Sequence, residues 1–154
     1  AETDLRYAAE KVRAGAHFLT TQLFFDNERY FTFVQRARSM GITVPILPGI
    51  MPITDYRQIQ RFTEMCGSEI PFRLRSELER RVDEPEAVVD LGVAYATLQC
   101  ADLLARGAPG IHFYTLNRSP ASRAVCSALR AANRWPLSLD SAPAGATLGM
   151  TTKK

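Results

Sequence analysis

The sequence is poor in the residues that build metal centres and covalent cross-links. It has three cysteines, Cys66, Cys100 and Cys126, and two histidines, His17 and His112. The cysteines are odd in number, lie far apart and form no CxxC pair, which excludes a disulfide scaffold and argues against a zinc site. We therefore expect three free thiols in helical segments of a protein that resides in a reducing cytoplasm.

The chain also lacks a strong excess of charge. Nineteen basic residues against sixteen acidic ones give a net charge of +3, and this mild excess predicts neither a nucleic acid nor an anionic membrane as partner. A signal-peptide pattern is absent, and no apolar run approaches the roughly 18 residues that span a bilayer. The dinucleotide motif GxGxxG and the phosphate motif GxxxxGK[ST] are missing as well, which disfavours the two nucleotide-binding folds that use them.

What the sequence does contain is an alternation of apolar runs with amphipathic segments. Short runs bounded by turn residues predict strands at 18–25, 44–50, 69–74 and 110–116. Apolar residues at helical spacing, with capping residues such as Asp26-Asn27 and Thr54-Asp55 before them and glycine after them, predict helices. Pro85 suits a first helical position. These helices are expected over 4–14, 28–40, from Thr54-Asp55 to Gly67, 85–106 and 119–132, with a charged, solvated helix and turn over 75–84. The segment 135–154 is rich in Pro, Ser, Ala and Gly, and we expect a flexible tail there.

Strands separated by helices predict a parallel α/β sheet. The first and last expected strands start 93 residues apart, at 18 and 111, so three intervals average 31 residues. A (β/α)8 barrel of about 250 residues has the same spacing per unit. The spacing fits four consecutive units of such a barrel, but it fits a small open sheet equally well.

Ligands of parallel α/β folds bind at the carboxyl ends of the strands, and few polar residues lie there. Gln22 lies in the first expected strand, where its amide could contact a ligand or be a satisfied core group. Arg118 precedes the helix start at Ser119, so it could bind a carboxylate or phosphate or be a solvated cap residue.

Other candidates have two interpretations as well. Phe62 and Tyr114 could be core aromatics or platforms for a flat ligand. Asp4 and Lys11 are seven residues apart on one helix face, which makes either a solvated stripe or a pair that reaches one ligand. His112 alternates with apolar neighbours, and we expect it to be buried. The sequence shows no Ser-His-Asp, His-Cys or paired-carboxylate arrangement.

Three segments carry a resemblance to a known family. They are AGAHFLTTQLFFD (14–26), VPILPGIMPITDYRQIQRF (44–62) and GIHFYTLNR (110–118). In this order they resemble the methylenetetrahydrofolate reductases, from about residue 4 to about residue 130. The resemblance implies a (β/α)8 TIM barrel that binds FAD. It also implies reduction of 5,10-methylenetetrahydrofolate to 5-methyltetrahydrofolate by NADH or NADPH, with the flavin carrying the hydride.

The resemblance also implies roles for individual residues. Gln22 matches a glutamine that contacts the folate pterin and the nicotinamide, for which an amide offers both a donor and an acceptor. The other matches to folate contacts are Gln58, Phe62, Tyr114 and Arg118. Asp4 and Lys11 match residues that line the FAD, where Lys11 suits the pyrophosphate. Tyr7 and Glu10 stand at neighbouring cofactor positions.

The matched segments correspond to the second half of the family barrel, so we expect residues 1–134 to form its last four β/α units. The glutamate that protonates the folate belongs to an early strand, so no residue here is assigned as catalytic and the fragment is expected to be inactive alone. Exposed sheet edges of a half-barrel favour a homo-oligomer. Two alternatives stay open: a non-catalytic half-barrel that binds folate or flavin, and a barrel enzyme that binds a phosphate ligand at Arg118 and Ser119.

Overall fold

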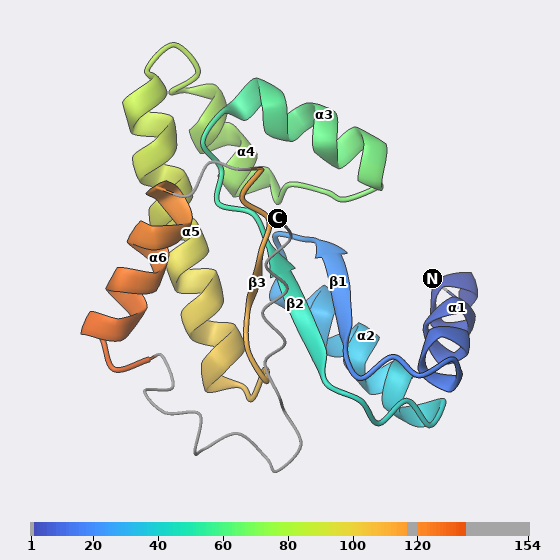
Figure 1. Ribbon diagram of the computed structural model, residues 1–154. Coiled ribbons are helices and arrows are strands. Elements are labelled where there is room, and N and C mark those ends of the chain that lie inside the picture. Colours follow the sequence, from blue (N-terminus) through green and yellow to red (C-terminus); the bar gives the residue numbers. More distant parts are fainter. Residues whose placement is uncertain (1, 117–119, 135–154) are drawn as a thin grey trace, which may run out of the picture.

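The computed structural model describes residues 2–116 and 120–134, in which a three-stranded sheet alternates with helices (Figure 1). The strands are β1 (Leu19–Leu23), β2 (Ile46–Ile50) and β3 (His112–Phe113), in the order β1-β2-β3, and both pairings are parallel. The helices are α1 (Glu2–Arg13), α2 (Asn27–Ser39), α3 (Tyr56–Cys66), α4 (Phe72–Glu79), α5 (Pro85–Ala105) and α6 (Pro120–Ala131). The predicted βαβ crossovers are confirmed, but within the described residues the sheet is open and does not close into a barrel.

The helices lie on three sides of the sheet, and two of them lie beyond the carboxyl ends of its strands (Figure 1). Helices α5 and α6 pack together along the β3 side, α3 and α4 lie beyond the carboxyl ends, and α1 lies beside β1 (Figure 1). As predicted, Asp26 caps α2 by accepting from the backbone N–H of Glu28 at 3.0 Å. Asp55 caps α3 in the same manner by accepting from Gln58 N at 2.9 Å.

The prediction of a strand at 69–74 is wrong, because the chain begins α4 there. Pro71 occupies the N-cap position with φ −53°, and it has no N–H to donate to a sheet ladder. Leu74 and Leu78 are the buried residues of α4, and their spacing of four is helical rather than strand-like. The described sheet therefore has three strands instead of the four predicted. The mean spacing of 31 residues was calculated with 69–74 as one of the four strands, and that segment is not a strand.

The apolar residues Val88, Leu91, Tyr95 and Leu98 predict one buried stripe for α5, and this is confirmed in part: Val88 is buried, and Leu91 and Tyr95 are partly buried against the core. Leu98, expected beside Val88 on the buried face, is 72% exposed. The buried face holds mainly small residues, which let α5 approach its neighbours closely; they are Val88, Gly92, Ala96, Gln99, Cys100 and Leu103. By length and composition α5 could also cross a bilayer, contrary to the expectation that no segment would. The core helix of a globular protein meets the same criterion, and α5 contacts α6, α2 and β2.

Strand β3 is shorter than expected and its histidine is not buried. Only two residues of the predicted 110–116 pair with β2. His112 is exposed because it lies on the face of β3 opposite Ile111 and Phe113, which pack against the core. Its ring packs edge-on against Tyr114 at 4.8 Å between centroids. Arg118 and Ser119, and the tail 135–154, lie outside the described residues.

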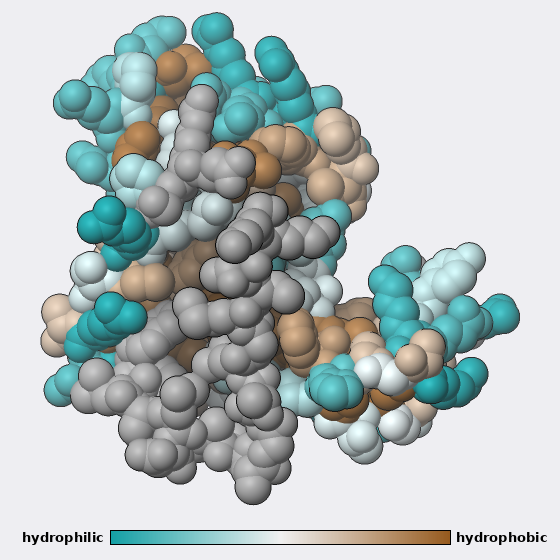
Figure 2. All heavy atoms as spheres, in the orientation of Figure 1, coloured by the Kyte–Doolittle hydropathy of each residue, from teal (hydrophilic) through white to brown (hydrophobic). Residues whose placement is uncertain are grey.

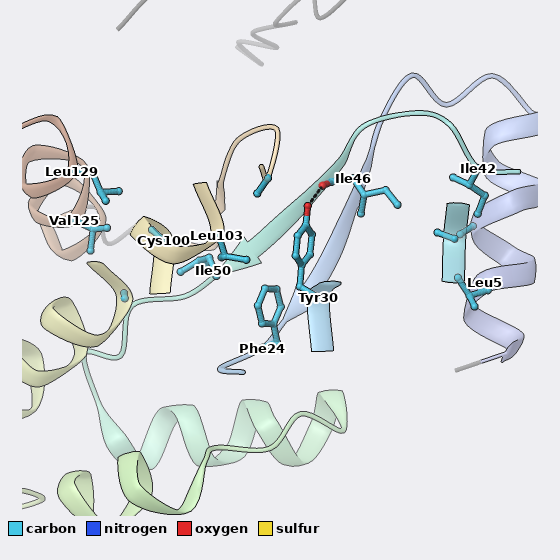
Figure 3. Packing of buried hydrophobic residues seen from close by; sticks show 14 of the residues in the cluster. Leu5, Phe24, Tyr30, Ile42, Ile46, Ile50, Cys100, Leu103, Val125 and Leu129 are labelled. Atoms are coloured by element: carbon cyan, nitrogen blue, oxygen red, sulfur yellow. Dashed lines mark hydrogen bonds between the residues drawn. The ribbon is translucent and has the colours of Figure 1, made fainter. Parts of the chain in front are cut away.

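The apolar core has two parts. The larger one lies between the sheet and α1, α2, α5 and α6, and Figure 3 draws 14 of its residues and labels ten, from Leu5 to Leu129. Within it, the Tyr30 hydroxyl donates to the carbonyl of Ile46 at 2.8 Å (Figure 3). The smaller part joins the end of β1 to α3, α4 and the first turns of α5; it comprises Leu23, Phe25, Ile53, Tyr56, Ile59, Leu74, Leu78 and Val88.

The buried hydroxyl and thiol of the larger core predict a loss of stability at alkaline pH. Burial raises the pKa of Tyr30 to about 12 and that of Cys100 to about 12. Both groups hold their protons more tightly in the folded state, so their contribution is complete below about pH 9 and is lost between about pH 9 and 12. We expect the free energy of unfolding to fall there by up to about 1.4 kcal/mol per pH unit for each group.

Urea unfolding between about pH 8 and about pH 12 measures this effect. This range runs from below the ordinary pKa values of the two groups to their raised values of about 12. The Tyr30→Phe variant should show a shallower fall above about pH 10, because it has no phenol to ionise. An equally steep fall in that variant would show that Tyr30 does not contribute.

Candidate functional site

Gln22 lies in an irregularity of β1. Thr20 pairs with Leu47 and Leu23 pairs with Gly49, so three steps along β1 match two along β2. Such a bulge changes the direction of the side chains that it carries. The Gln22 side chain is exposed, and its Oε1 accepts from the backbone N–H of Leu23 at 3.0 Å. The alternative of a buried core amide is therefore wrong.

Side chains satisfy the backbone groups that the bulge removes from the ladder. Thr21 Oγ1 accepts from Gly49 N at 2.9 Å, and the Tyr114 hydroxyl donates to Thr21 O at 2.9 Å. Burial raises the pKa of Tyr114, so this hydroxyl stays protonated as a donor. A Cβ at Gly49 would lie 2.5 Å from Thr21 O and 2.6 Å from Tyr114 Cε2, so only glycine fits. The sequence suggested that Gly49 belongs to a Gly-Pro loop that could bring the backbone close to a ligand, whereas Gly49 lies within β2. Thr21 was not predicted as part of the site, because it carries no local signal of this contact.

A narrow cleft beyond the end of β2 brings together three of the five predicted folate contacts. Gln58 comes from the first turn of α3, Phe62 from its next turn, and Tyr114 from the residue after β3. Both aromatic residues also pack against the smaller core, so they are core residues on one side and cleft walls on the other. The cleft is lined by 51–55, Gln58, Ile59, Phe62, 114–116, Ala121 and Ser122.

A larger cavity of about 850 Å³ lies between α1 and β1. Figure 2 shows the molecule hollowed on the side between α1 and α3, with apolar side chains along the hollow. All four predicted cofactor residues line the cavity from α1, and Gln22 lines it from β1. The α1 residues are Asp4, Tyr7, Glu10 and Lys11. The prediction that Asp4 and Lys11 share one helix face is thus confirmed.

The unpaired edge of β1 forms part of the wall of this cavity. Six successive residues, 19–24, line it. Side chains of a strand alternate between its faces, so an unbroken series means that the cavity runs along the backbone edge. Within the described residues β1 pairs only with β2, and its other edge is open to a further strand.

The residues of the cavity fit part of the FAD that the resemblance implies. Lys11 supplies a cation that suits a pyrophosphate. Arg29 also lines the cavity, but its guanidinium is paired with Glu69. The carboxylates of Asp4 and Glu10 can accept from ribityl or ribose hydroxyls. The volume lies in the range of cofactor sites, roughly 300 to 1,000 Å³.

The described residues offer no comparable arrangement for a metal. No group of three or more His, Cys, Asp or Glu side chains is close enough together in that part of the chain. The three cysteines are free thiols in α3, α5 and α6, as expected from their spacing; Cys100 is buried and the other two are half-buried.

Comparison with known proteins places this geometry in context. Residues 1–130 match the family described as methylenetetrahydrofolate reductase. The chain is 43% identical over 116 residues to methylenetetrahydrofolate reductase (NADH) 1 of Arabidopsis thaliana, and 40% identical over 140 residues to a probable methylenetetrahydrofolate reductase (NADPH) of Caenorhabditis elegans. It is 37% identical over 129 residues to 5,10-methylenetetrahydrofolate reductase of Escherichia coli strain K12.

These matches cover most of this chain but less than half of each of the three relatives. They cover 75%, 90% and 84% of this chain, but 20%, 21% and 44% of the three relatives. The chain therefore spans less than half the length of each of these three relatives.

Proposed function

This chain belongs to the methylenetetrahydrofolate reductase family, and from that membership we propose that it forms a folate- and cofactor-binding part of a flavin-dependent reductase. The complete enzyme would reduce 5,10-methylenetetrahydrofolate to 5-methyltetrahydrofolate with NADH or NADPH. The open three-stranded sheet would then be a fragment of the TIM barrel that the family implies. The observation that carries the proposal is the position of the bulge: Gln22 faces the larger cavity while Thr21 bonds Tyr114 at the cleft.

In the proposed reaction the residues of this chain bind and orient. FAD, when bound, would supply the hydride chemistry, held through Asp4, Tyr7, Glu10 and Lys11. Gln22 Oε1 is already bonded to Leu23 N, so its Nε2 is the group left to donate to an acceptor on the pterin or the nicotinamide.

The cleft has a volume of only about 30 Å³ and does not enclose a folate, so its residues would contact the folate from one side, through its aromatic wall. Phe62 offers a ring to a flat ligand, and Gln58 offers an amide one turn away. Arg118 is proposed to contact an anionic or carbonyl group of the same ligand. We assign no proton donor to this chain, because the resemblance places that glutamate in an early strand of the barrel.

A chimaeric enzyme tests the proposal as a whole. Residues 1–130 of this chain would replace the matching segment of the Escherichia coli relative, which is 37% identical. We expect NADH- or NADPH-dependent reduction of 5,10-methylenetetrahydrofolate, lowered about tenfold or more by Gln22→Ala, which removes one hydrogen bond to the ligand. A folded chimaera that carries flavin but does not turn over the folate would overturn the proposal.

Binding to the chain alone is a second test. We expect 5-methyltetrahydrofolate to bind without turnover, and Phe62→Ala to weaken binding about tenfold by removing the aromatic wall. The matched control is Phe72→Ala, since Phe72 is 72% exposed and lines neither the cleft nor the larger cavity. Calorimetric titration measures both. Equal affinities in the two variants, or binding of simple phosphoesters in place of folate, would contradict the proposed role of the cleft.

A further inference from the structure

Three successive carbonyls that follow Gln22 are each bonded by a side chain from a distant part of the chain. Ser68 Oγ donates to Leu23 O at 2.7 Å, and Gln99 Nε2 donates to Phe24 O at 3.0 Å. The Tyr95 hydroxyl donates to Phe25 O at 2.5 Å. These carbonyls stand where β1 leaves the sheet, so the ladder no longer supplies their partners.

Two of the three donors come from one face of α5. Tyr95 and Gln99 are four residues apart, which places them one above the other on the helix. Gln99 is only 7% exposed, so its amide serves Phe24 rather than water. Asn27 Nδ2 in turn donates to the backbone carbonyl of Gln99 at 3.1 Å, which ties the start of α2 to the same turn of α5.

The orientation of the Gln22 amide depends on this segment. Leu23 N donates to Gln22 Oε1, so the direction of that N–H sets which way the amide points. Leu23 N and Leu23 O lie on one residue, and the next two carbonyls are anchored on α5. A shift of the 23–25 backbone would therefore turn the Gln22 side chain as well.

We infer that Tyr95 and Gln99 are positioning residues for Gln22: they hold the backbone after the bulge so that the Gln22 Nε2 faces the ligand. This inference rests on the proposed function, in which Gln22 contacts the folate and the nicotinamide. Neither residue lines the cleft or the larger cavity. Displacements of about 1 Å in groups that orient a substrate can cost as much as a hundredfold in rate.

The first test is independent of any ligand. Tyr95→Phe and Gln99→Leu each delete a donor while nearly keeping the side-chain volume. The matched control is Thr97→Val, which deletes a hydroxyl that donates to Val93 O within α5. In the ¹⁵N-labelled chain we expect the double variant to exchange its Leu23 amide proton about tenfold faster and to shift the Gln22 side-chain amide resonance.

In the Thr97→Val control, Leu23 exchange should stay within about twofold of the starting chain. Tyr95→Phe alone, the mildest change, should show the same direction of effect if the double variant does not fold. Unchanged Leu23 exchange in a folded Tyr95→Phe/Gln99→Leu variant would overturn the inference.

The second test is a double-mutant cycle in the chimaera described above. Gln22→Ala should lower kcat/KM about tenfold in the starting protein but only about twofold in the Tyr95→Phe/Gln99→Leu background, because a misplaced Gln22 has little left to lose. Independent, additive effects would show a merely structural role and overturn the inference. If the starting chimaera does not reduce 5,10-methylenetetrahydrofolate, the proposed function has failed. The exchange rate of the Leu23 amide proton then still decides whether α5 positions Gln22.

Discussion

Replacing Gly92 by alanine is expected to destabilise the protein strongly. A Cβ at this position would lie 1.9 Å from the carbonyl oxygen of Ile53 and 2.8 Å from its carbonyl carbon. These are backbone atoms beside a buried side chain, so they cannot turn away as a flexible side chain would. We expect a loss of about 3 kcal/mol or more in the free energy of unfolding, at the upper end of the cost of overpacking.

Whether Gly92→Ala lowers or raises the free energy of unfolding shows whether the contact with Ile53 or local helix propensity decides the effect. By preference alone, alanine in place of glycine inside a helix stabilises by about 1 kcal/mol. The matched control is Ala94→Gly at an exposed position of the same helix, where only preference acts and a loss of about 1 kcal/mol is expected. Urea unfolding followed by circular dichroism measures both variants. A stabilised Gly92→Ala protein would show that α5 does not approach Ile53 closely.

Replacing Gly49 by alanine is expected to disrupt the bulge and with it the binding of folate. The new Cβ would lie 2.5 Å from Thr21 O and 2.6 Å from Tyr114 Cε2, and these two groups are joined by a hydrogen bond. Relief requires either the β1 backbone or the Tyr114 ring to move. We expect a loss of about 2 kcal/mol in stability and an affinity for 5-methyltetrahydrofolate as low as that of Gln22→Ala.

The control for Gly49 is another glycine of the same region. A Cβ at Gly110 would meet only Leu47 Cδ2, at 3.4 Å, and that side chain can adjust. Gly110→Ala should therefore change stability by less than about 1 kcal/mol and leave the folate affinity unchanged. Chemical unfolding and calorimetric titration of both variants test this. Equal behaviour of the two would mean that the tight contact at Gly49 plays no part in forming the site.

Local sequence signals predicted the helix boundaries well. Asp26 and Asp55 were expected at the starts of α2 and α3, and both accept from the backbone N–H groups of the first turn. Pro85 was expected in the first turn of α5 and lies there. Such signals succeed because the residues that decide them are three or four positions apart, within one turn of helix.

Predictions that depended on the surroundings of a residue were less successful. Leu98 is as apolar as Val88, but it points away from the elements that cover α5. His112 alternates with apolar residues, but it lies on the face of β3 that does not pack against the core. Apolar residues near Pro71 suggested a strand, whereas the buried Leu74 and Leu78 belong to a helix. In each case the local pattern was compatible with a buried or an exposed side chain, or with a strand or a helix. Contacts with distant elements decided which of the two formed.

The sequence by itself determined the alternation of strands and helices, the caps, the free cysteines and the membership in the reductase family. Only the tertiary structure decided how Gln22 is presented. Its bulge depends on Thr21, Gly49 and Tyr114, which lie up to 93 residues apart along the chain. Its backbone is held from Tyr95 and Gln99, 70 and 75 residues away from the carbonyls that they bond. No local pattern encodes such pairs, because the polar groups of a bulge take their partners from whichever elements the folded chain brings beside them.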